Sequence, residues 1–288
     1  VILCWFVSVV YGSLCTDLTG TWRNQLNSNM TIRNVDGNSF TGVYHTAVES
    51  NTGAASISSN ISGMIQDTEN GKLIGFNVLW NKGASLTAWV GQCMVCNDQE
   101  KIYTTWVLRS YLPVKKRWMT TRINQDTFFR VDSSAHEESN DIVPILSEDT
   151  IVQDASDSLS NQAHPNSVSK TTESISGIHG RWVASSRDSF EVKEIKDHGI
   201  FNGIHQSHGE NGGFSVGRFD GNQAYAAVGF IAAQPTKLRG YTGHIDDPEV
   251  TGQILETSWL EHTFHHDCLA PRKFVRFGID NFSKVDHV

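Results

Sequence analysis

The segment Trp80-Asn-Lys-Gly-Ala-Ser85-Leu-Thr87-Ala-Trp89-Val-Gly91-Gln-Cys93 holds the most informative pattern in this chain of 288 residues. The same half of the chain carries Gly20-Thr-Trp22-Arg-Asn24, Trp106-Val-Leu108 and Trp118. These tryptophans fall in separate strand-like runs, and each has a hydroxyl or amide residue nearby. Aromatic walls with a few polar contacts are typical of pockets for small, rigid, uncharged ring systems. The pattern therefore predicts such a pocket among β-strands.

Short β-rich runs alternate with turn signals through the whole first half. The predicted strands lie near residues 19–26, 29–35, 39–48, 57–65, 73–81, 86–96, 100–110 and 118–131. Turns are marked by Asp36-Gly-Asn38, Asn51-Thr-Gly53 and Glu69-Asn-Gly71. Eight short strands at near-regular spacing, without helical periodicity, predict an up-and-down antiparallel barrel. Closure of the barrel removes edge strands and leaves room for one small ligand.

The second half of the chain repeats this plan. Markers of the first half are Gly20-Thr-Trp22, Phe40-Thr-Gly42, Gly75-Phe76, Val90-Gly91, Thr105-Trp106 and Thr127-Phe128. Their counterparts are Gly180-Arg-Trp182, Phe201-Asn-Gly203, Gly229-Phe230, Thr242-Gly243, Ser258-Trp259 and Asn281-Phe282. The spacings agree within a few residues, which indicates an internal duplication. The predicted fold class is all-β, with two eight-stranded antiparallel up-and-down β-barrels.

Charge and composition define the regions around the two barrels. A formal charge of -8 without a basic cluster argues against a nucleic-acid partner. Residues 1–12 form a short apolar run that resembles part of a secretory signal peptide and is too short to span a bilayer. We therefore expect a secreted, extracellular protein that does not bind membranes. Residues 133–174 are rich in Ser, Asp, Glu and Asn, and predict a disordered linker between barrels at 13–132 and 175–288.

Secretion makes the five cysteines interpretable. Cys4 lies in the predicted signal, and a structural disulfide between Cys15 and Cys93 is favoured. Cys93 and Cys96 could also form a metal or redox Cys-x-x-Cys, but no second ligand pair follows at zinc spacing. Cys96 and Cys268 are then either paired with each other or free. Sequons predict glycosylation at the three asparagines Asn29, Asn60 and Asn281.

The order and spacing of these residues in the first half resemble avidin and streptavidin, the β-barrels that bind biotin. The resemblance covers residues 15–131. It implies that Asn24, Ser28 and Tyr44 direct three donors at the ureido oxygen of biotin, in a dry pocket where such bonds strengthen. Thr46 and Asp126 would accept the two ureido N–H groups, and the carboxylate of Asp126 would make a charge-assisted bond.

The resemblance also assigns the walls of the pocket. Thr87 would face the ring sulfur, and Ser85 would bind the valerate carboxylate. The apolar box around the bicyclic ring would consist of Trp80, Trp89, Trp106 and Leu108. Trp118 matches a tryptophan that reaches into the pocket of a neighbouring subunit in the family, which implies a homo-oligomer, a dimer or a tetramer. The chain departs from the family in the loop 49–56 and at Lys82 and Gly83, near the expected ligand tail.

The second half is predicted to keep the fold and to lose the biotin site. It retains Trp182, Trp259 and Asp280 at the positions of Trp22, Trp106 and Asp126. The other matched positions differ: Ala184, Asp188 and His205 replace the donors Asn24, Ser28 and Tyr44, Ala232 is matched to Trp80, Lys237 and Arg239 replace Ser85 and Thr87, and Arg272 replaces Trp118. The charged residues are expected to form structural salt bridges, with a site for a different, polar ligand as the alternative.

Three alternatives to a biotin-binding barrel are open at this stage. A lipocalin is also a secreted eight-stranded barrel, and Gly20-Thr-Trp22 satisfies its Gly-x-Trp motif. An extracellular structural or oligomerisation module without a ligand is the second. A zinc site at His262, His265, His266 and Asp267 is the third, but their spacing on one strand suits chelation poorly. The sequence shows no nucleophile signature, so we expect no enzyme, no metal and no cofactor apart from biotin as a bound ligand.

Overall fold

The computed structural model describes residues 15–48, 58–69, 71–112, 114–131, 177–207, 212–221, 225–246 and 253–285. The predicted signal segment 1–12, the predicted linker 133–174 and the loop 49–56 lie outside these residues. Within the described part of the chain, no helix has the length and apolar character needed to cross a bilayer.

Strands β1 to β8 form the first closed antiparallel barrel, called barrel one below, in the order of the sequence. They are β1 (Gly20–Asn24), β2 (Asn29–Asp36), β3 (Ser39–His45), β4 (Ser59–Thr68), β5 (Gly71–Trp80), β6 (Ser85–Cys96), β7 (Gln99–Ser110) and β8 (Thr121–Arg130). The last predicted strand, 118–131, was placed too early. A short 3-10 helix, η3 (Val114–Met119), precedes β8, so residues 118–120 are not part of the strand.

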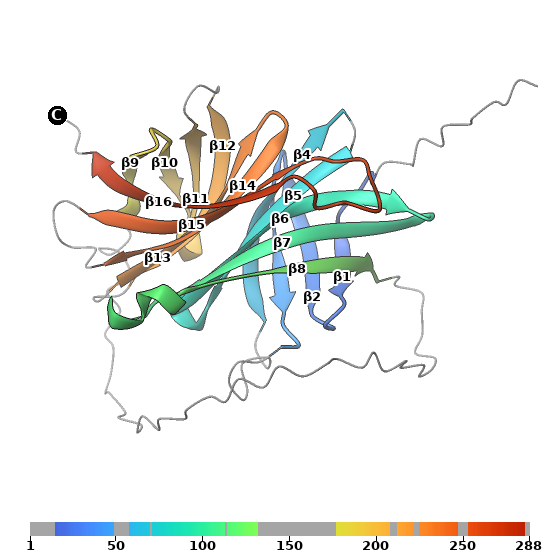
Figure 1. The fold of residues 1–288 in the computed structure, drawn as a ribbon, viewed down its shortest axis with the longest axis horizontal. Helices are drawn as coiled ribbons and strands as arrows, with labels where there is room; N and C mark the ends of the chain where they lie inside the picture. The colour runs from blue at the N-terminus through green and yellow to red at the C-terminus, as the bar shows by residue number, and fades with distance from the viewer. Residues whose placement is uncertain are drawn as a thin grey trace, which may run out of the picture.

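Strands β9 to β16 form a second closed barrel, barrel two, in which β9 pairs with both β10 and β16. They are β9 (Gly180–Ala184), β10 (Ser189–Ile195), β11 (Ile200–Gln206), β12 (Gly213–Gly221), β13 (Tyr225–Gln234), β14 (Lys237–Asp246), β15 (Ile254–Thr263) and β16 (Val275–Val285). The two barrels lie side by side, with β13 to β15 next to β5 to β7 (Figure 1). The predicted all-β architecture of two eight-stranded barrels is confirmed.

The first strand of each barrel is fixed in the same way. Trp22 and Trp182 are fully buried, and each indole Nε1 donates to the carbonyl oxygen four residues earlier, of Leu18 or Ile178, at 2.9 Å. A buried indole needs such a partner for its single N–H. The repeated contact shows that the two halves share local structure as well as sequence markers.

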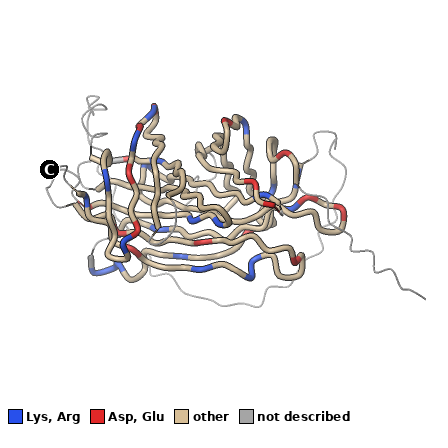
Figure 2. The backbone as a smooth tube through the Cα atoms, turned by 90° about the horizontal axis from the view of Figure 1, so that it is seen from above, with Lys and Arg blue, Asp and Glu red and all other residues tan. Residues whose placement is uncertain are grey.

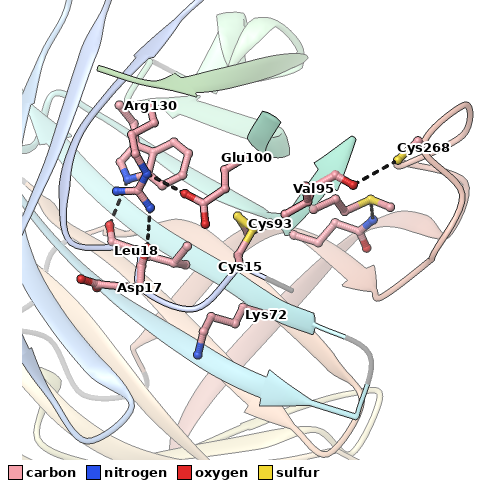
Figure 3. Close-up of a disulfide and its surroundings, with 12 residues drawn as sticks. Cys15, Asp17, Leu18, Lys72, Cys93, Val95, Glu100, Arg130 and Cys268 are labelled. Atoms are coloured by element: carbon pink, nitrogen blue, oxygen red, sulfur yellow. Dashed lines mark hydrogen bonds and ion pairs between the residues drawn. A yellow bond between two sulfur atoms is a disulfide. The ribbon is translucent and has the colours of Figure 1, made fainter. Parts of the chain in front are cut away.

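One disulfide closes the end of barrel one, as predicted. Cys15 is bonded to Cys93 of β6, and both residues are buried in the barrel-one core (Figure 3). Next to it, Arg130 of β8 donates to Glu100 at 2.6 Å and to the backbone oxygen of Thr19 at 2.9 Å. The disulfide and the arginine together hold the segment before β1 against the barrel end.

A hydrophobic layer joins the two barrels. Its buried residues are Met64, Leu73, Ala88, Val90 and Val107 of barrel one and Val216, Ile231, Ala233, Leu238 and Leu260 of barrel two. Glycines permit the close approach: a Cβ at Gly75 would lie 2.8 Å from Ile231, and a Cβ at Gly229 would lie 3.2 Å from Asn77. These four residues occupy equivalent positions in the two barrels, so the packing is reciprocal, as in a twofold dimer interface.

Covalent and polar contacts add to this layer. Cys96 at the end of β6 is bonded to Cys268, which answers the question that the sequence left open. Arg109 of β7 donates to Glu256 of β15 at 2.9 Å, and Arg117 donates to the same carboxylate at 3.0 Å. Basic and acidic residues are interspersed along the chain in both barrels (Figure 2). The second half of the chain therefore covers an apolar face of the first half.

Candidate ligand-binding site

Four aromatic side chains meet inside barrel one. Trp89 of β6 stacks on Phe76 of β5 with centroids 4.8 Å apart, and Tyr44 of β3 lies 5.2 Å from Trp89. Trp80 at the end of β5 meets Tyr44 edge-on at 5.9 Å and Trp89 at 6.4 Å. Trp106 of β7 packs against the same core and is paired with Trp89 across the strands. The result is an aromatic interior built by the three neighbouring strands β5, β6 and β7 together with β3.

Two indole groups in this interior are oriented by polar partners. Trp89 Nε1 donates to Asp126 Oδ2 of β8 at 2.9 Å, and Trp80 Nε1 donates to Thr87 Oγ1 at 2.8 Å. Thr87 and Asp126 are both buried. Because these bonds use the only N–H of each indole, they fix the ring planes of the two walls.

The predicted donors Asn24, Ser28 and Tyr44 are all buried at the β1–β3 side of this interior. Asn24 Oδ1 accepts from the backbone N–H of Ser28 at 2.8 Å, which leaves the amide nitrogen as the group that can donate. Burial raises the pKa of Tyr44, and the charge of Asp126 raises it further, against a hydrogen bond from Ser28. The Tyr44 hydroxyl therefore keeps its proton at neutral pH and can act as a donor.

Other predicted residues lie at the rim or outside the interior. Thr46 Oγ1 donates to the backbone oxygen of Val48 at 2.9 Å at the end of β3. Ser85 and Leu108 are partly buried on β6 and β7, and Leu108 pairs with Thr87. Trp118 lies on η3 with 83% of its surface exposed. The other eleven predicted ligand residues, all within the described ranges, are buried or half-buried, so Trp118 differs from them in its exposure.

Sequence reasoning missed Phe76 in this interior and Gln25, an exposed residue that contacts Asp126 from outside it. Phe76 forms the stack under Trp89, and Gln25 donates to Asp126 Oδ1 at 3.4 Å while its oxygen accepts from Thr127 N at 2.8 Å. Phe76 recurs as Phe230 in the second half, so the duplication was a usable signal for an inward-facing aromatic. Gln25 lies in the β1–β2 turn, and no pattern marked it.

The strand register of barrel two shows that one residue match between the two halves, that of Ala232 with Trp80, was wrong. Trp80 pairs with Ser85 in barrel one, and Gln234 pairs with Lys237 in barrel two. Gln234, and not Ala232, therefore stands at the position of Trp80. The β13–β14 turn is two residues shorter than the β5–β6 turn, so counting back from the later strand gave the wrong residue.

Inside barrel two, the predicted salt bridges are present. Arg239 Nη1 donates to Asp188 Oδ2 at 2.6 Å, and Arg239 Nη2 donates to Glu261 Oε2 at 2.6 Å. Lys237 lies 3.3 Å from the same glutamate oxygen. His205 Nε2 is 3.1 Å from the hydroxyl of Tyr241, the residue at the position of Trp89. Charged side chains thus bind one another where barrel one has its aromatic interior.

Two further groups of barrel two contact barrel one. Arg272 donates to the backbone oxygens of Thr104 at 3.0 Å and Asp126 at 2.6 Å, so it anchors the β15–β16 connection on β7 and β8. His262 Nε2 lies 3.1 Å from Gln92 Oε1. β15 ends at Thr263, so His265 and His266 do not share its strand, contrary to the sequence expectation. Among the described residues, no three His, Cys, Asp or Glu side chains are grouped to hold a metal ion.

The closed antiparallel barrels and the aromatic interior define the class of the protein as an all-β barrel protein. The sequence model of the avidin family matches residues 13–131. Avidin-related protein 4/5 of Gallus gallus is 38% identical over 117 residues, 40% of this chain and 77% of that protein. Avidin of Gallus gallus is 38% identical over 120 residues, 40% of this chain and 78% of avidin.

The chain belongs to the avidin family through its first barrel. The solved structure of a biotin binding protein from chicken shares 36% identity, covering 40% of this chain and 97% of that one, with a TM-score of 0.38. Membership of this family excludes the lipocalin alternative for barrel one.

Proposed function

We propose that barrel one binds biotin and that the chain is a secreted biotin-binding protein. Avidin-family membership is the observation that carries this proposal. The proposed ligand residues are the twelve that the resemblance assigns, from Asn24 to Asp126. The two disulfides support secretion, because such bonds persist in oxidising compartments.

The interior of barrel one supports a planar, uncharged ligand. Asn24 and Tyr44 offer donors on one side, and Asp126 offers an acceptor on the other, between aromatic walls. Trp89 already binds Asp126, so biotin would share this carboxylate with the indole. Burying an apolar ring among Trp80, Trp89 and Trp106 gains several kcal/mol at about 25 cal/mol per Å².

Calorimetry of the full chain with biotin tests the proposal. We expect one biotin per chain, because barrel two lacks the donors and has Arg239 in its interior. Trp106→Ala should weaken binding by a factor of about 30 to 1000, the effect of losing a buried aromatic contact worth about 2–4 kcal/mol. The matched control is Trp259→Ala, which removes the equivalent tryptophan of barrel two and should leave the affinity unchanged.

The calorimetric results distinguish between biotin binding in barrel one, in both barrels and in neither. Absence of any biotin heat would reject biotin as the ligand. Two sites per chain, or equal loss of affinity in both tryptophan variants, would show that barrel two binds biotin as well.

For barrel two we propose a structural role as a fused partner. Its outer face supplies half of the hydrophobic layer and the Cys268 bond to barrel one. Without barrel two, the barrel-one residues of this hydrophobic layer would be exposed and would favour association. Replacing Val90 with aspartate should therefore loosen the packing between the disulfide-linked barrels and lower the thermal midpoint, whereas Val35→Asp, at an exposed position of β2, should not.

A further inference from the structure

The guanidinium of Arg239 is largely buried inside barrel two. Arg239 stands on β14 at the position of Thr87, since Arg239 pairs with Glu261 as Thr87 pairs with Leu108. Its side chain is 11% exposed, and Glu261 is 3% exposed. The longer side chain therefore extends into the space that a short threonine leaves open in barrel one.

All three nitrogens of the guanidinium are bonded. Nε and Nη2 donate to Glu261 Oε2 at 3.1 and 2.6 Å, and Nη1 donates to Asp188 Oδ2 at 2.6 Å and to Tyr241 Oη at 3.0 Å. The guanidinium carbon lies 4.4 Å from the centroid of Trp259, which is within cation–π range. Carboxylates and an aromatic face thus surround a planar cation from several directions.

These contacts coincide with the proposed ligand positions of barrel one. Asp188 stands where Ser28 stands, since the backbone N–H of Ala184 bonds to Asp188 as that of Asn24 bonds to Ser28. Tyr241 and Trp259 are paired as Trp89 and Trp106 are paired. The acceptor Asp188 replaces a hydroxyl, so the polarity of the pocket is inverted to suit a donor group.

We propose that Arg239 is a built-in occupant of the barrel-two pocket, and that the side chains around it form a binding site for a planar guanidinium group. The site excludes other ligands because its own side chain fills it. The inference rests on the contacts inside barrel two and does not depend on which ligand barrel one binds.

Chemical rescue of Arg239→Ala in the full chain tests this proposal. The substitution leaves Asp188 and Glu261 without their main cation and should lower the thermal midpoint by roughly 10 °C. Ethylguanidinium replaces the missing part of the side chain, so it should restore most of this loss with a saturable dependence on concentration. Ethylammonium, which lacks the planar donor fork, and urea, which lacks the charge, should restore much less.

Two controls make the outcome decisive. Wild type and Arg181→Ala, which removes an exposed arginine of β9, should show no saturable gain with ethylguanidinium. The triple variant Arg239→Thr, Asp188→Ser, Glu261→Leu carries the residues of barrel one, so it should fold without any cation and show no response.

The proposal is overturned if ethylguanidinium gives Arg239→Ala no saturable gain, or the same gain as ethylammonium. If Arg239→Ala does not fold alone, we expect refolding from urea to succeed with ethylguanidinium present. Failure with ethylguanidinium, under conditions where the triple variant refolds, would equally overturn it. Biotin binding is not part of this measurement, so its result is separate from that of the proposed function.

Discussion

Replacing His262 with glutamine should make the unfolding free energy less sensitive to acid. His262 is fully buried between the barrels, and its Nε2 contacts Gln92 Oε1 at 3.1 Å. Its Nδ1 has no hydrogen-bond partner among the described residues. Burial, together with the neighbouring charges of Arg272 and His265, lowers the pKa of His262 to about 4.

The unfolding free energy that His262 costs in acid follows from the difference between its folded and unfolded pKa values. The unfolded histidine takes up a proton near its ordinary pKa of 6.5, and the folded one does so only near 4. Its contribution to stability is therefore complete above pH 6.5 and is lost as the pH falls towards 4. The loss is about 3 kcal/mol in total, and the steepest change is about 1 kcal/mol per pH unit.

Two other histidines add to this effect. Burial also lowers the pKa values of His205 and His244 to about 4. The three histidines together make the unfolding free energy change by about 3–4 kcal/mol per pH unit. Burial raises the pKa values of Asp220 and Asp280, which favours the folded state in acid and offsets part of this slope.

Urea unfolding followed by tryptophan fluorescence, between about pH 4.5 and 7.5, measures the slope. We expect His262→Gln to lose about a third of the histidine contribution, since glutamine keeps a donor for Gln92 but does not titrate. His179→Gln, at an exposed position before β9, is the matched control and should keep the wild-type slope. Equal slopes in His262→Gln and wild type would contradict the assignment of this acid sensitivity to His262.

Three other perturbations have defined outcomes. Replacing Cys96 and Cys268 with alanine should lower the unfolding free energy by about 5 kcal/mol in urea titrations, because the bond joins positions 172 residues apart; a loss below about 1 kcal/mol would contradict the loop-closure estimate. Arg109→Leu should cost about 2 kcal/mol by calorimetry, since it removes one of two arginines from Glu256 at the interface; an unchanged midpoint would mean that Arg117 alone suffices. Trp118→Ala should loosen the oligomer in native mass spectrometry and speed biotin release, while changing chain stability by less than about 0.5 kcal/mol, because the side chain is 83% exposed. An oligomer and release rate equal to wild type would remove its proposed role between chains.

The strands, the duplication and the two barrels could be predicted from the amino-acid sequence. Short strands separated by turn residues are compatible with few topologies. The repeated markers predict the same topology for both halves of the chain. The sequence also determined which half carries the aromatic interior, because Trp80, Trp89 and Trp106 fall on adjacent strands whose inward positions follow from a period of two. Local pattern is sufficient for the strands and their inward faces, and the duplication is visible because the same local markers recur at similar spacings in the second half.

The packing of the barrels had a weaker signal in the sequence. Strands β5, β6 and β13 are apolar at consecutive positions rather than alternate ones, which is typical of strands buried on both faces. That pattern indicates a covered outer face. It does not say what covers it, because a second chain and the second half of the same chain bury the same surface.

The remaining features depend on how distant parts of the chain pack in three dimensions. The register of β13 and β14 placed Gln234 at the position of Trp80, because a turn shortened by two residues shifts every position counted across it. The partner of Cys96 and the position of Arg239 between Asp188 and Glu261 likewise depend on this packing. These contacts join residues 22 to 172 positions apart, and closure of the barrels and their packing bring them together, so no local pattern encodes them.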